Sequence, residues 1–481
     1  MPRLFSILLI FLASTFTLFS QDFHSKIIPG ANQSAVYVGS YDWGACIDKI
    51  IINTGHQVSP QAVKLKDFKV NQILYPKDTN AGMDKGSLPL IKAFVSDSDG
   101  NETDSPSNFI TLLTYVHPLA ENLNPFVSIS FSSRFKKYYG YKITNRELGI
   151  LIQNLKGFVN ETAAKFATSD FEYTFPESEE KIHLNYASYI PATESSEKVP
   201  LILWFHGIGE SGTNIYQVLF GTKTTALAGQ KIQSRFENGT AILAPQCPTG
   251  WLETTEKGPG NARVWAPVDK DAPANTVTKP VTKLLKKLSL APDKPRKDKT
   301  PFAAVSYYTE PVKKLLFHFL AEHPEIDRNR IYVGGCSAGG YMTMNMMIES
   351  PELFAAAFPI CEFYLDSKIT SSQIKNLAQK PLWFTYALND ESVNPEKNSI
   401  PTIIRLNEAD AENLHYSEFK NVTDLSGKYL LDPDADSDDS SYGLPFEYEG
   451  HWSWIHVLND DCIDGNLSLF EWLAMQKLKK D

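Results

Sequence analysis

Short apolar runs separated by turn residues fill the first third of the chain. Between about residues 25 and 170, apolar and polar positions alternate over short stretches, and the segment Asp97–Asn101 is the clearest turn between them. The runs that we predict to be strands are Ser34–Gly39, Cys46–Asn53, Phe68–Tyr75, Leu90–Ser96, Phe109–Val116, Phe126–Phe131 and Gly140–Thr144. About seven short strands at this spacing favour an all-β sandwich of immunoglobulin type.

From about Phe171 the pattern changes to that of an α/β domain. Phe171–Phe175 and Lys181–Ile190 predict an antiparallel pair of strands, and the apolar run Pro200–Phe205 suits a buried central strand. The later strands are expected at Thr240–Ala244, Ile331–Gly335 and Pro381–Ala387, and helices at Glu310–Glu322 and Phe470–Lys477. This alternation predicts a mostly parallel sheet, and the chain divides into domains at residues 25–170 and 171–481.

The segment Gly335–Gly339 reads Gly-Cys-Ser-Ala-Gly and fits the nucleophile-elbow pattern G-x-S-x-G. A strand-like run precedes it and a helical run rich in methionine follows, so Ser337 is expected at a sharp strand-to-helix turn. Glycines on both sides tolerate the close backbone approach that such a turn requires. The turn presents the hydroxyl above the sheet, and the helix that follows directs its first amides at a developing oxyanion.

A serine hydroxyl needs a base to remove its proton and an acid to orient that base. In hydrolases built on this elbow the acid follows the serine in the chain, and the histidine follows the acid. The apolar run Leu382–Ala387 ends directly in carboxylates, so we expect Asp390 to be the acid, with Glu391 as the alternative.

The base is expected among the three histidines that follow the serine. His451 comes after a glycine and before an aromatic helical segment, which suits a side chain that reaches into a cleft. His456 is the alternative, whereas His415 lies in a strand-like run and is expected to pack. No catalytic set assembles among His24, His56 and His117 of the first domain.

The oxyanion hole is expected to combine the amide of Ala338 with one from the loop that follows the first central strand. This loop reads His-Gly-Ile-Gly-Glu-Ser-Gly from His206, and its glycines permit a tight backbone. Either Gly207 or Ile208 is the expected donor. His206 precedes the nucleophile and is expected to be structural.

These motifs resemble those of secreted α/β-hydrolase esterases of the prolyl-oligopeptidase-like and polyhydroxybutyrate-depolymerase-like group. Within that group the chain is most similar to esterases that carry an N-terminal immunoglobulin-like domain. The segments that carry the resemblance are Phe205–Glu210, Ala244–Pro248, Gly335–Gly340, Asn389–Asp390 and Gly450–Trp454, with Asp42–Lys49 for the first domain. The chain departs from the group at Ser211, where an arginine is usual.

The resemblance and the residues together predict a serine ester hydrolase that works through an acyl-enzyme. His451 would act as base and then acid, Asp390 would orient it, and no metal or cofactor is required. The expected partner is a small or polysaccharide-linked ester. Carbohydrate or phenolic esters are favoured by four tryptophans in candidate cleft loops, Trp251, Trp265, Trp452 and Trp454. A serine peptidase of the same fold and a non-catalytic surface-binding protein are the alternatives.

The N-terminal segment and the net charge indicate where the protein is located and which partners are excluded. Arg3 precedes the apolar run Leu4–Phe19, and the small Ser20 offers a cleavage position, as in a secretory signal peptide of residues 1–20. We therefore expect a secreted or periplasmic protein with no membrane segment after cleavage, and an uncleaved anchor is the alternative. The net charge of −10 argues against nucleic acid as a partner.

Three further features of the sequence each leave two interpretations open. The odd number of cysteines, 5, implies no disulfide framework, although Cys336 and Cys361 are expected near neighbouring strand ends and could be bridged or free. The insertion Trp251–Pro301 is a solvated basic loop or a cap over the substrate. The acidic segment Asp432–Asp439 is a surface loop or a calcium site that lacks the EF-hand glycine and glutamate.

Overall fold

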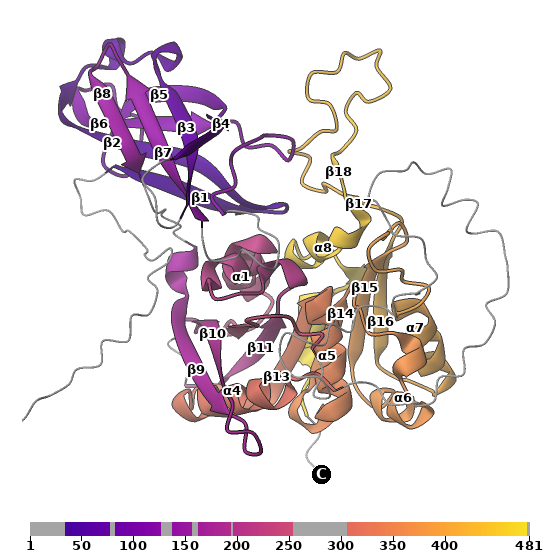
Figure 1. Cartoon of the computed structure of the whole chain (residues 1–481). Coiled ribbons are helices and arrows are strands. Elements are labelled where there is room, and N and C mark those ends of the chain that lie inside the picture. The colour runs from indigo at the N-terminus through magenta and orange to yellow at the C-terminus, as the bar shows by residue number, and fades with distance from the viewer. Residues whose placement is uncertain are drawn as a thin grey trace, which may run out of the picture.

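The structure, a computed structural model, describes residues 34–76, 82–126, 137–155, 162–193, 196–253 and 305–478 (Figure 1). The predicted signal segment, nearly all of the insertion after Trp251, and the predicted strand Phe126–Phe131 beyond its first residue lie outside these ranges.

The first domain contains two antiparallel sheets among its described residues. One sheet has the order β1-β2-β6-β5 and the other the order β4-β3-β7-β8. Their strands are β1 Ala35–Tyr41, β2 Gly44–Val58, β3 Lys69–Pro76, β4 Met83–Ser87, β5 Leu90–Ser96, β6 Ser107–Thr114, β7 Lys137–Asn145 and β8 Ile150–Leu155. The short turns η1 Pro60–Ala62, η2 Leu65–Asp67 and η3 Ala163–Lys165 connect or follow them.

The two sheets share one apolar core, which is why the alternating runs fold as they do. Val36 and Ile50 of the first sheet lie in the same buried cluster as Val70 and Ile143 of the second. The apolar positions of each strand therefore face the other sheet, and the polar positions between them face solvent. The structure shows an all-β domain of two packed sheets, with β4 and β8 as strands that the sequence pattern did not predict.

The second domain is built on a sheet with the order β16-β15-β14-β13-β11-β12-β10-β9 in the described part of the chain. Pairing is parallel from β12 through β11 to β16 and antiparallel for β10 and β9, which confirms the predicted mostly parallel sheet with an antiparallel pair at its edge. The strands are β9 Ala167–Thr174, β10 Lys181–Tyr189, β11 Val199–Phe205, β12 Ala241–Gln246, β13 Ile326–Cys336, β14 Ala356–Ile360, β15 Leu382–Ala387 and β16 Leu414–Phe419.

Helices cover both faces of this sheet (Figure 1). They are α1 Ile215–Gly221, α2 Gln230–Gln233, α4 Thr309–Glu322, α5 Ala338–Glu349, α6 Ser371–Leu377, α7 Ser399–Glu408, α8 Trp454–Leu458 and α9 Leu469–Met475. Alternate residues of β11 divide between two cores: Trp204 packs in the cluster of α1, α8 and α9, and Leu203 in the cluster of α4 to α7. The central strand is apolar throughout because both of its faces are covered.

Short elements complete the second domain. They are the turns η4 Ile208–Glu210, η5 Thr224–Ala228, η6 Pro351–Leu353, η7 Asp366–Lys368 and η8 Gly450–Trp452, and the strand pairs β17 Val422–Thr423 with β18 Glu447–Tyr448 and β19 Ile463–Asp464 with β20 Leu467–Ser468. Residues 424–446, between β17 and β18, leave the body of the domain and rise beside the first domain; we call them the 424–446 excursion (Figure 1).

The tip of the β1–β2 hairpin joins the two domains. The Asp42 carboxylate accepts hydrogen bonds from Lys223 Nζ at 2.8 Å and from Asn459 Nδ2 at 2.9 Å. Gly44 is packed against the end of α1, where a Cβ would lie 3.6 Å from the carbonyl oxygen of Gly221. The core of the first domain is continuous with the α1 and α8 side of the second, so the two pack as one body.

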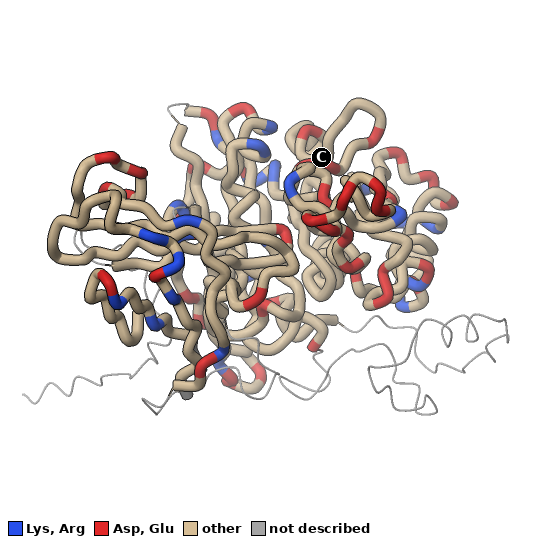
Figure 2. Tube along the Cα trace, turned by 90° about the horizontal axis from the view of Figure 1, so that it is seen from above, with Lys and Arg blue, Asp and Glu red and all other residues tan. Residues whose placement is uncertain are grey.

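Two further observations concern the distribution of charge and the apolar character of the helices. Acidic positions are spread over both domains, including the part of the α/β domain near the C-terminus, in keeping with the net charge of −10 (Figure 2). Among the described residues, none of the helices combines the length and the apolar character needed to cross a membrane.

Candidate active site

Ser337 lies at the turn between β13 and α5, in a backbone conformation that few non-glycine residues adopt. Its φ is 57° and its ψ is −117°, and α5 begins at the next residue. Such a conformation is costly and is retained where the surrounding structure enforces it. Gly335 and Gly339 on either side pack directly against the carbonyl oxygen of Phe205, where any Cβ would collide. The two glycines of the motif are therefore required by β11, which lies beside the elbow.

The His451 ring connects this serine to a carboxylate. Its Nε2 lies 2.9 Å from Ser337 Oγ, and its Nδ1 lies 2.8 Å from Asp390 Oδ2. A carboxylate can only accept, so Nδ1 carries the proton and Nε2 is left as the acceptor for the serine hydroxyl. The structure thus brings the three predicted side chains into one hydrogen-bonded chain, although His451 and Ser337 are 114 positions apart in the sequence.

Asp390 is fixed from behind by its own loop. Its Oδ1 accepts the backbone N–H of Ser392 at 2.8 Å and that of Val393 at 2.7 Å, and its side chain is 1% exposed. These two bonds leave Oδ2 directed at the imidazole. The loop that carries His451 approaches closely because Gly450 packs against the backbone of Asn389, where a Cβ would collide. The glycine before the histidine is thus a steric requirement, a role that the sequence analysis did not assign.

The alternative residues lie outside this chain of bonds. Glu391 is exposed on the loop beside Asp390. His456 is buried in α8, its ring is stacked on Phe419 with centroids 3.9 Å apart, and neither ring nitrogen has a hydrogen-bond partner. Burial lowers the pKa of His456 to about 4, so it is a neutral packing residue. His415 in β16 stacks on Trp383 and contacts Asp464, as expected for a residue with a packing role.

The loop after β11 is held in place by His206. The His206 Nδ1 donates to the carbonyl oxygen of Gly207 at 2.6 Å, and its Nε2 accepts the backbone N–H of Cys247 at 2.9 Å. Trp251 Nε1 donates to the carbonyl oxygen of His206 at 3.1 Å. His206 is fully buried. His206 therefore braces the loop that carries Gly207 and Ile208, the two candidates for one oxyanion donor. The other expected donor, Ala338, is the first residue of α5.

The structure bears on three further features that the sequence singled out. Trp251, expected in a cleft loop, is fully buried because its indole braces His206. Cys336 and Cys361 are both buried and free, so the bridge considered for them is not formed. The acidic segment Asp432–Asp439 is largely exposed, and within the described ranges no group of three or more His, Cys, Asp or Glu side chains is placed to hold a metal ion.

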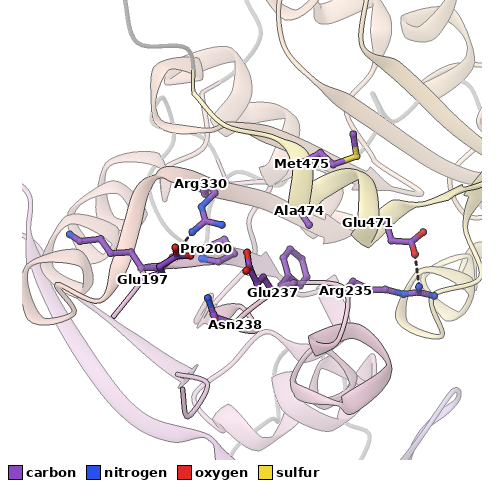
Figure 3. Close-up of a pocket in the computed structure, with 11 residues that line it drawn as sticks. Glu197, Pro200, Arg235, Glu237, Asn238, Arg330, Glu471, Ala474 and Met475 are labelled. Carbon is purple, nitrogen blue, oxygen red and sulfur yellow. Dashed lines mark hydrogen bonds and ion pairs between the residues drawn. The ribbon is translucent and has the colours of Figure 1, made fainter. Parts of the chain in front are cut away.

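A cavity of about 370 Å³ lies at the opposite end of the sheet from the serine (Figure 3). Pro200 at the start of β11 and Arg330 in the first half of β13 line it, together with Arg235 and Glu471. Arg235 already bonds Glu471 at 2.6 Å and Asp460 at 2.7 Å, which ties the α2 region to α9. This cavity shares no residue with the Ser337 site, and the Arg235–Glu471 pair in its wall serves as a brace.

Comparison of the sequence with protein families gives one match that bears on this site. Residues 314–370 match the prolyl oligopeptidase family. The matched segment runs from α4 through the elbow to the loop after β14 and contains Ser337. Among curated proteins, no sequence matches the chain.

Solved structures show where the fold occurs elsewhere. The structure of a thermostable esterase is similar over 92% of this chain and 99% of its own, with 20% sequence identity and a TM-score of 0.61. An acylaminoacyl peptidase of Pyrococcus horikoshii is similar over 59% of this chain and 41% of its own, with 15% identity and a TM-score of 0.35. A ferulic acid esterase is similar over 53% and 90%, with 10% identity and a TM-score of 0.31. The first likeness extends through both domains and shows that the second has the α/β-hydrolase fold.

The family match, the fold and the hydrogen-bonded chain of Ser337, His451 and Asp390 indicate that the protein is an enzyme, a serine hydrolase. The alternative of a non-catalytic surface-binding protein with a degenerate hydrolase domain is set aside on the same grounds.

Proposed function

We propose that the chain is a serine carboxylic-ester hydrolase whose nucleophile, base and acid are Ser337, His451 and Asp390. One observation carries this proposal: the imidazole lies 2.9 Å from the serine oxygen and 2.8 Å from the carboxylate, in the tautomer that a general base requires. The strained serine backbone supports it, because strain of this kind is retained at functional sites.

The reaction proceeds in two halves. His451 Nε2 takes the proton of Ser337 as the serine oxygen attacks the ester carbonyl, and it returns that proton to the leaving alcohol when the tetrahedral intermediate collapses. The acyl group is then bound to Ser337. Water, deprotonated by the same nitrogen, attacks the acyl-enzyme, and the acid product leaves as the serine recovers its proton. Asp390 remains ionised throughout and stabilises the transient imidazolium.

The oxyanion of each tetrahedral intermediate is proposed to bind the amides of Ala338 and Ile208. Ala338 is the first residue of α5, so its N–H is one of the helix's unpaired donors. Of the two candidates in the loop after β11, the geometry favours Ile208. A Cβ on Gly207 would lie 3.1 Å from the carboxyl of Glu210 and 3.9 Å from the thiol of Cys336, so Gly207 packs toward the interior.

Esters of carbohydrates or phenols are the proposed substrate class. Trp452 follows the base directly and is partly exposed, so it offers an aromatic face at the rim of the site. A panel of acetyl, feruloyl and longer-chain acyl esters, free and sugar-linked, ranks the candidates by kcat/KM. Aliphatic esters preferred over all sugar-linked and phenolic esters would reject this substrate class and leave the esterase proposal standing.

A serine peptidase of the same fold is the second candidate, favoured by the family match over residues 314–370. The same three residues cleave amides and esters, so the site geometry does not separate them. Acylaminoacyl and prolyl peptide amides assayed beside p-nitrophenyl esters decide between the two, and cleavage of the amides at comparable kcat/KM would replace the esterase assignment.

The test of the reaction itself is Ser337→Ala. We expect hydrolysis of a p-nitrophenyl ester to fall to background and labelling by a fluorophosphonate probe to disappear, with the unfolding temperature little changed. Retention of most of the activity in a folded Ser337→Ala protein would refute the proposed nucleophile.

The first domain and the location of the protein remain proposals of the same kind. We assign the two packed antiparallel sheets to an immunoglobulin-like sandwich and residues 1–20 to a cleaved signal peptide that directs the chain to the periplasm or outside the cell. The N-terminal residue of protein recovered from a periplasmic or culture fraction tests the second assignment, and an N-terminus at Met1 would contradict it.

A further inference from the structure

A groove lies between the first domain and the 424–446 excursion. Its volume is about 740 Å³. Ligand sites in proteins usually measure about 300–1,000 Å³, so the groove has the size of a binding site. Its walls come from residues 87–89 between β4 and β5, residues 115–122 after β6, and residues 431–434 of the excursion. Both domains thus contribute to one hollow, which shares no residue with the proposed triad.

Three large apolar side chains of this groove are exposed to solvent. Tyr115 is 40% exposed, Leu119 is 63% exposed, and Leu431 is 42% exposed. Exposed apolar residues that gather in one place mark binding surfaces, whereas scattered ones are ordinary. The Tyr115 ring stacks on His117, with centroids 5.5 Å apart and planes 8° from parallel. Because His117 covers one face of this ring, the opposite face is the one left for a ligand.

Hydrogen bonds from His117 hold the walls of the groove together. Its Nδ1 accepts the backbone N–H of Leu119 at 3.2 Å, so its Nε2 carries the proton and donates to the carbonyl oxygen of Leu430 at 3.3 Å. The first bond shapes the wall from the first domain, and the second ties that wall to the excursion. A ligand therefore meets a surface that is already formed, which lowers the entropy cost of binding.

The polar side chains of the groove are mainly acceptors. Glu121, Asp432 and Asp434 contribute carboxylates, and Asn122 contributes an amide. Among the described residues that line the groove, none is Lys or Arg. An anionic ligand would be repelled here, whereas hydroxyl groups can donate hydrogen bonds to the carboxylates.

A saccharide fits these walls better than an extended peptide does. Extended peptides bind by adding a strand to an unpaired edge. Here the N–H of Tyr115 already donates to the carbonyl oxygen of Pro89 at 2.7 Å, and the N–H of Leu431 donates to that of Leu444 at 2.9 Å. A sugar ring needs side chains only, because its C–H face packs on an aromatic ring and its hydroxyl groups donate to carboxylates.

Aromatic rings lead from this groove to the proposed active site. The ring centroids of His117 and Phe446 are 5.9 Å apart, those of Phe446 and Tyr448 are 5.0 Å apart, and those of Tyr448 and Trp452 are 6.2 Å apart. Trp452 directly follows His451. Three ring contacts thus separate the groove from the rim of the site, a separation that a chain of several sugars spans.

We propose that this groove binds the saccharide part of the substrate. A neutral oligosaccharide packs one sugar face on Tyr115 and donates hydroxyl groups to Asp432 and Asp434, while the ester that it carries lies at Ser337. The link to the ester rests on the proposed hydrolase function, whereas binding in the groove requires no turnover.

Isothermal titration calorimetry of the full chain with xylohexaose, cellohexaose and mannohexaose tests the binding. We expect at least one of these neutral hexasaccharides to bind with a Kd of about 1 mM or lower. Tyr115→Ala should weaken this binding about tenfold, because the sugar loses its stacking partner. Tyr115→Phe keeps the ring and should bind nearly as well as the wild type.

Matched variants separate the groove from general effects of substitution. Tyr442→Ala removes a tyrosine that is 59% exposed on the same excursion and does not line the groove, so it should leave the affinity unchanged. If Tyr115→Ala fails to fold, Leu431→Arg obstructs the groove from the other wall and should abolish binding. Its control is Leu425→Arg, at an exposed leucine of the excursion outside the groove.

A kinetic measurement tests the link to the active site. Tyr115→Ala should raise the KM for an acetylated hexasaccharide about tenfold relative to its KM for p-nitrophenyl acetate, because only the first substrate reaches the groove. An unchanged ratio of the two KM values, in a protein whose hexasaccharide affinity has fallen, would overturn this link.

Four results would overturn binding in the groove. They are the absence of binding by all three hexasaccharides, an unchanged affinity in folded Tyr115→Ala, equal losses in Tyr115→Ala and Tyr442→Ala, and binding of an oligolysine peptide in place of every hexasaccharide. None of these depends on Ser337→Ala, whose residual activity would refute the hydrolase mechanism and leave the calorimetric result unaffected.

Discussion

The Trp43 indole meets the Tyr429 ring edge-on across the boundary between the two domains, with centroids 4.8 Å apart. Tyr429 belongs to the 424–446 excursion, and β18, which follows the excursion, leads directly to His451. The aromatic rings that continue from Tyr429 toward the base are His117, Phe446, Tyr448 and Trp452, each within 6.2 Å of the next. The first domain therefore packs against the segment that leads to His451, the proposed base, through the hairpin tip and this row of rings.

Substitution of Trp43 tests this support. We expect Trp43→Ala to lower kcat about tenfold, because a misplacement of about 1 Å at the reacting groups costs up to about 10²-fold. The loss of the indole should also lower the free energy of unfolding by about 2 kcal/mol. Trp43→Phe keeps an aromatic ring opposite Tyr429 and should recover most of both losses, as measured by steady-state kinetics and thermal unfolding. A Trp43→Ala protein with wild-type kcat would show that the base is positioned without the first domain.

Asp390 and Glu391 are adjacent carboxylates with opposite expected effects. Asp390→Asn should lower kcat about 10³- to 10⁴-fold with KM nearly constant, because an amide in place of the carboxylate favours the wrong tautomer of His451. Glu391→Gln alters the same net charge on an exposed side chain and should leave kcat within twofold. Comparable losses of kcat in the two variants would indicate that Asp390 and Glu391 act together as the acid.

His456 should affect the pH dependence of stability and leave catalysis intact. Its pKa is lowered from 6.5 to about 4, so the folded protein binds this proton less readily than the unfolded chain. Its neutral form therefore supports the fold above pH 6.5, and this support is lost as the pH falls from 6.5 toward 4. His456→Phe should thus gain about 3 kcal/mol relative to the wild type between pH 7 and pH 4. Urea unfolding at several pH values measures this, and a difference that does not change with pH would contradict it.

Glu210 should affect stability with the opposite sign. Its pKa is raised from 4.5 to about 7, so the folded state holds the proton more tightly than the unfolded chain. Stability therefore falls as the pH rises from 4.5 to 7 and is constant above. Relative to the wild type, Glu210→Gln should become more stable by about 3 kcal/mol between pH 4.5 and pH 7.5. Parallel stability curves for the two proteins would show that the carboxyl is not neutral in the fold.

Much of this architecture can be read from local pattern. The run Pro200–Phe205 is apolar because β11 is covered on both faces, and the elbow motif is fixed by the contact of Gly335 and Gly339 with Phe205. The order of serine, acid and histidine followed from the fold class, and the structure brings the same three residues together. In the sequence, His456 differed from His451 as a candidate base only by its position in the chain. In the structure the two differ physically, because the His456 ring is stacked on Phe419.

Other features depend on contacts that no local pattern contains. The strand β14 reads Ala-Ala-Phe-Pro-Ile, a composition with little strand preference, and it is a strand because β13 and β15 lie on either side of it. The strand β4 is short and largely exposed, so it carries no apolar alternation. Glu210 would be expected on the surface from its charge alone, and its burial follows from the space left by Gly207 and Gly221.

The Asp42–Asn459 hydrogen bond spans 417 positions of the chain. A ribosome adds roughly 5–20 residues per second, so the hairpin tip emerges roughly 20 to 80 s before the partner that it holds. During that interval the first domain can fold, and Ser337 is added to the chain 114 positions before His451, the proposed base. The proposed triad is therefore incomplete until His451 has been added, and the docking of the β1–β2 hairpin onto the end of α8 comes after that point.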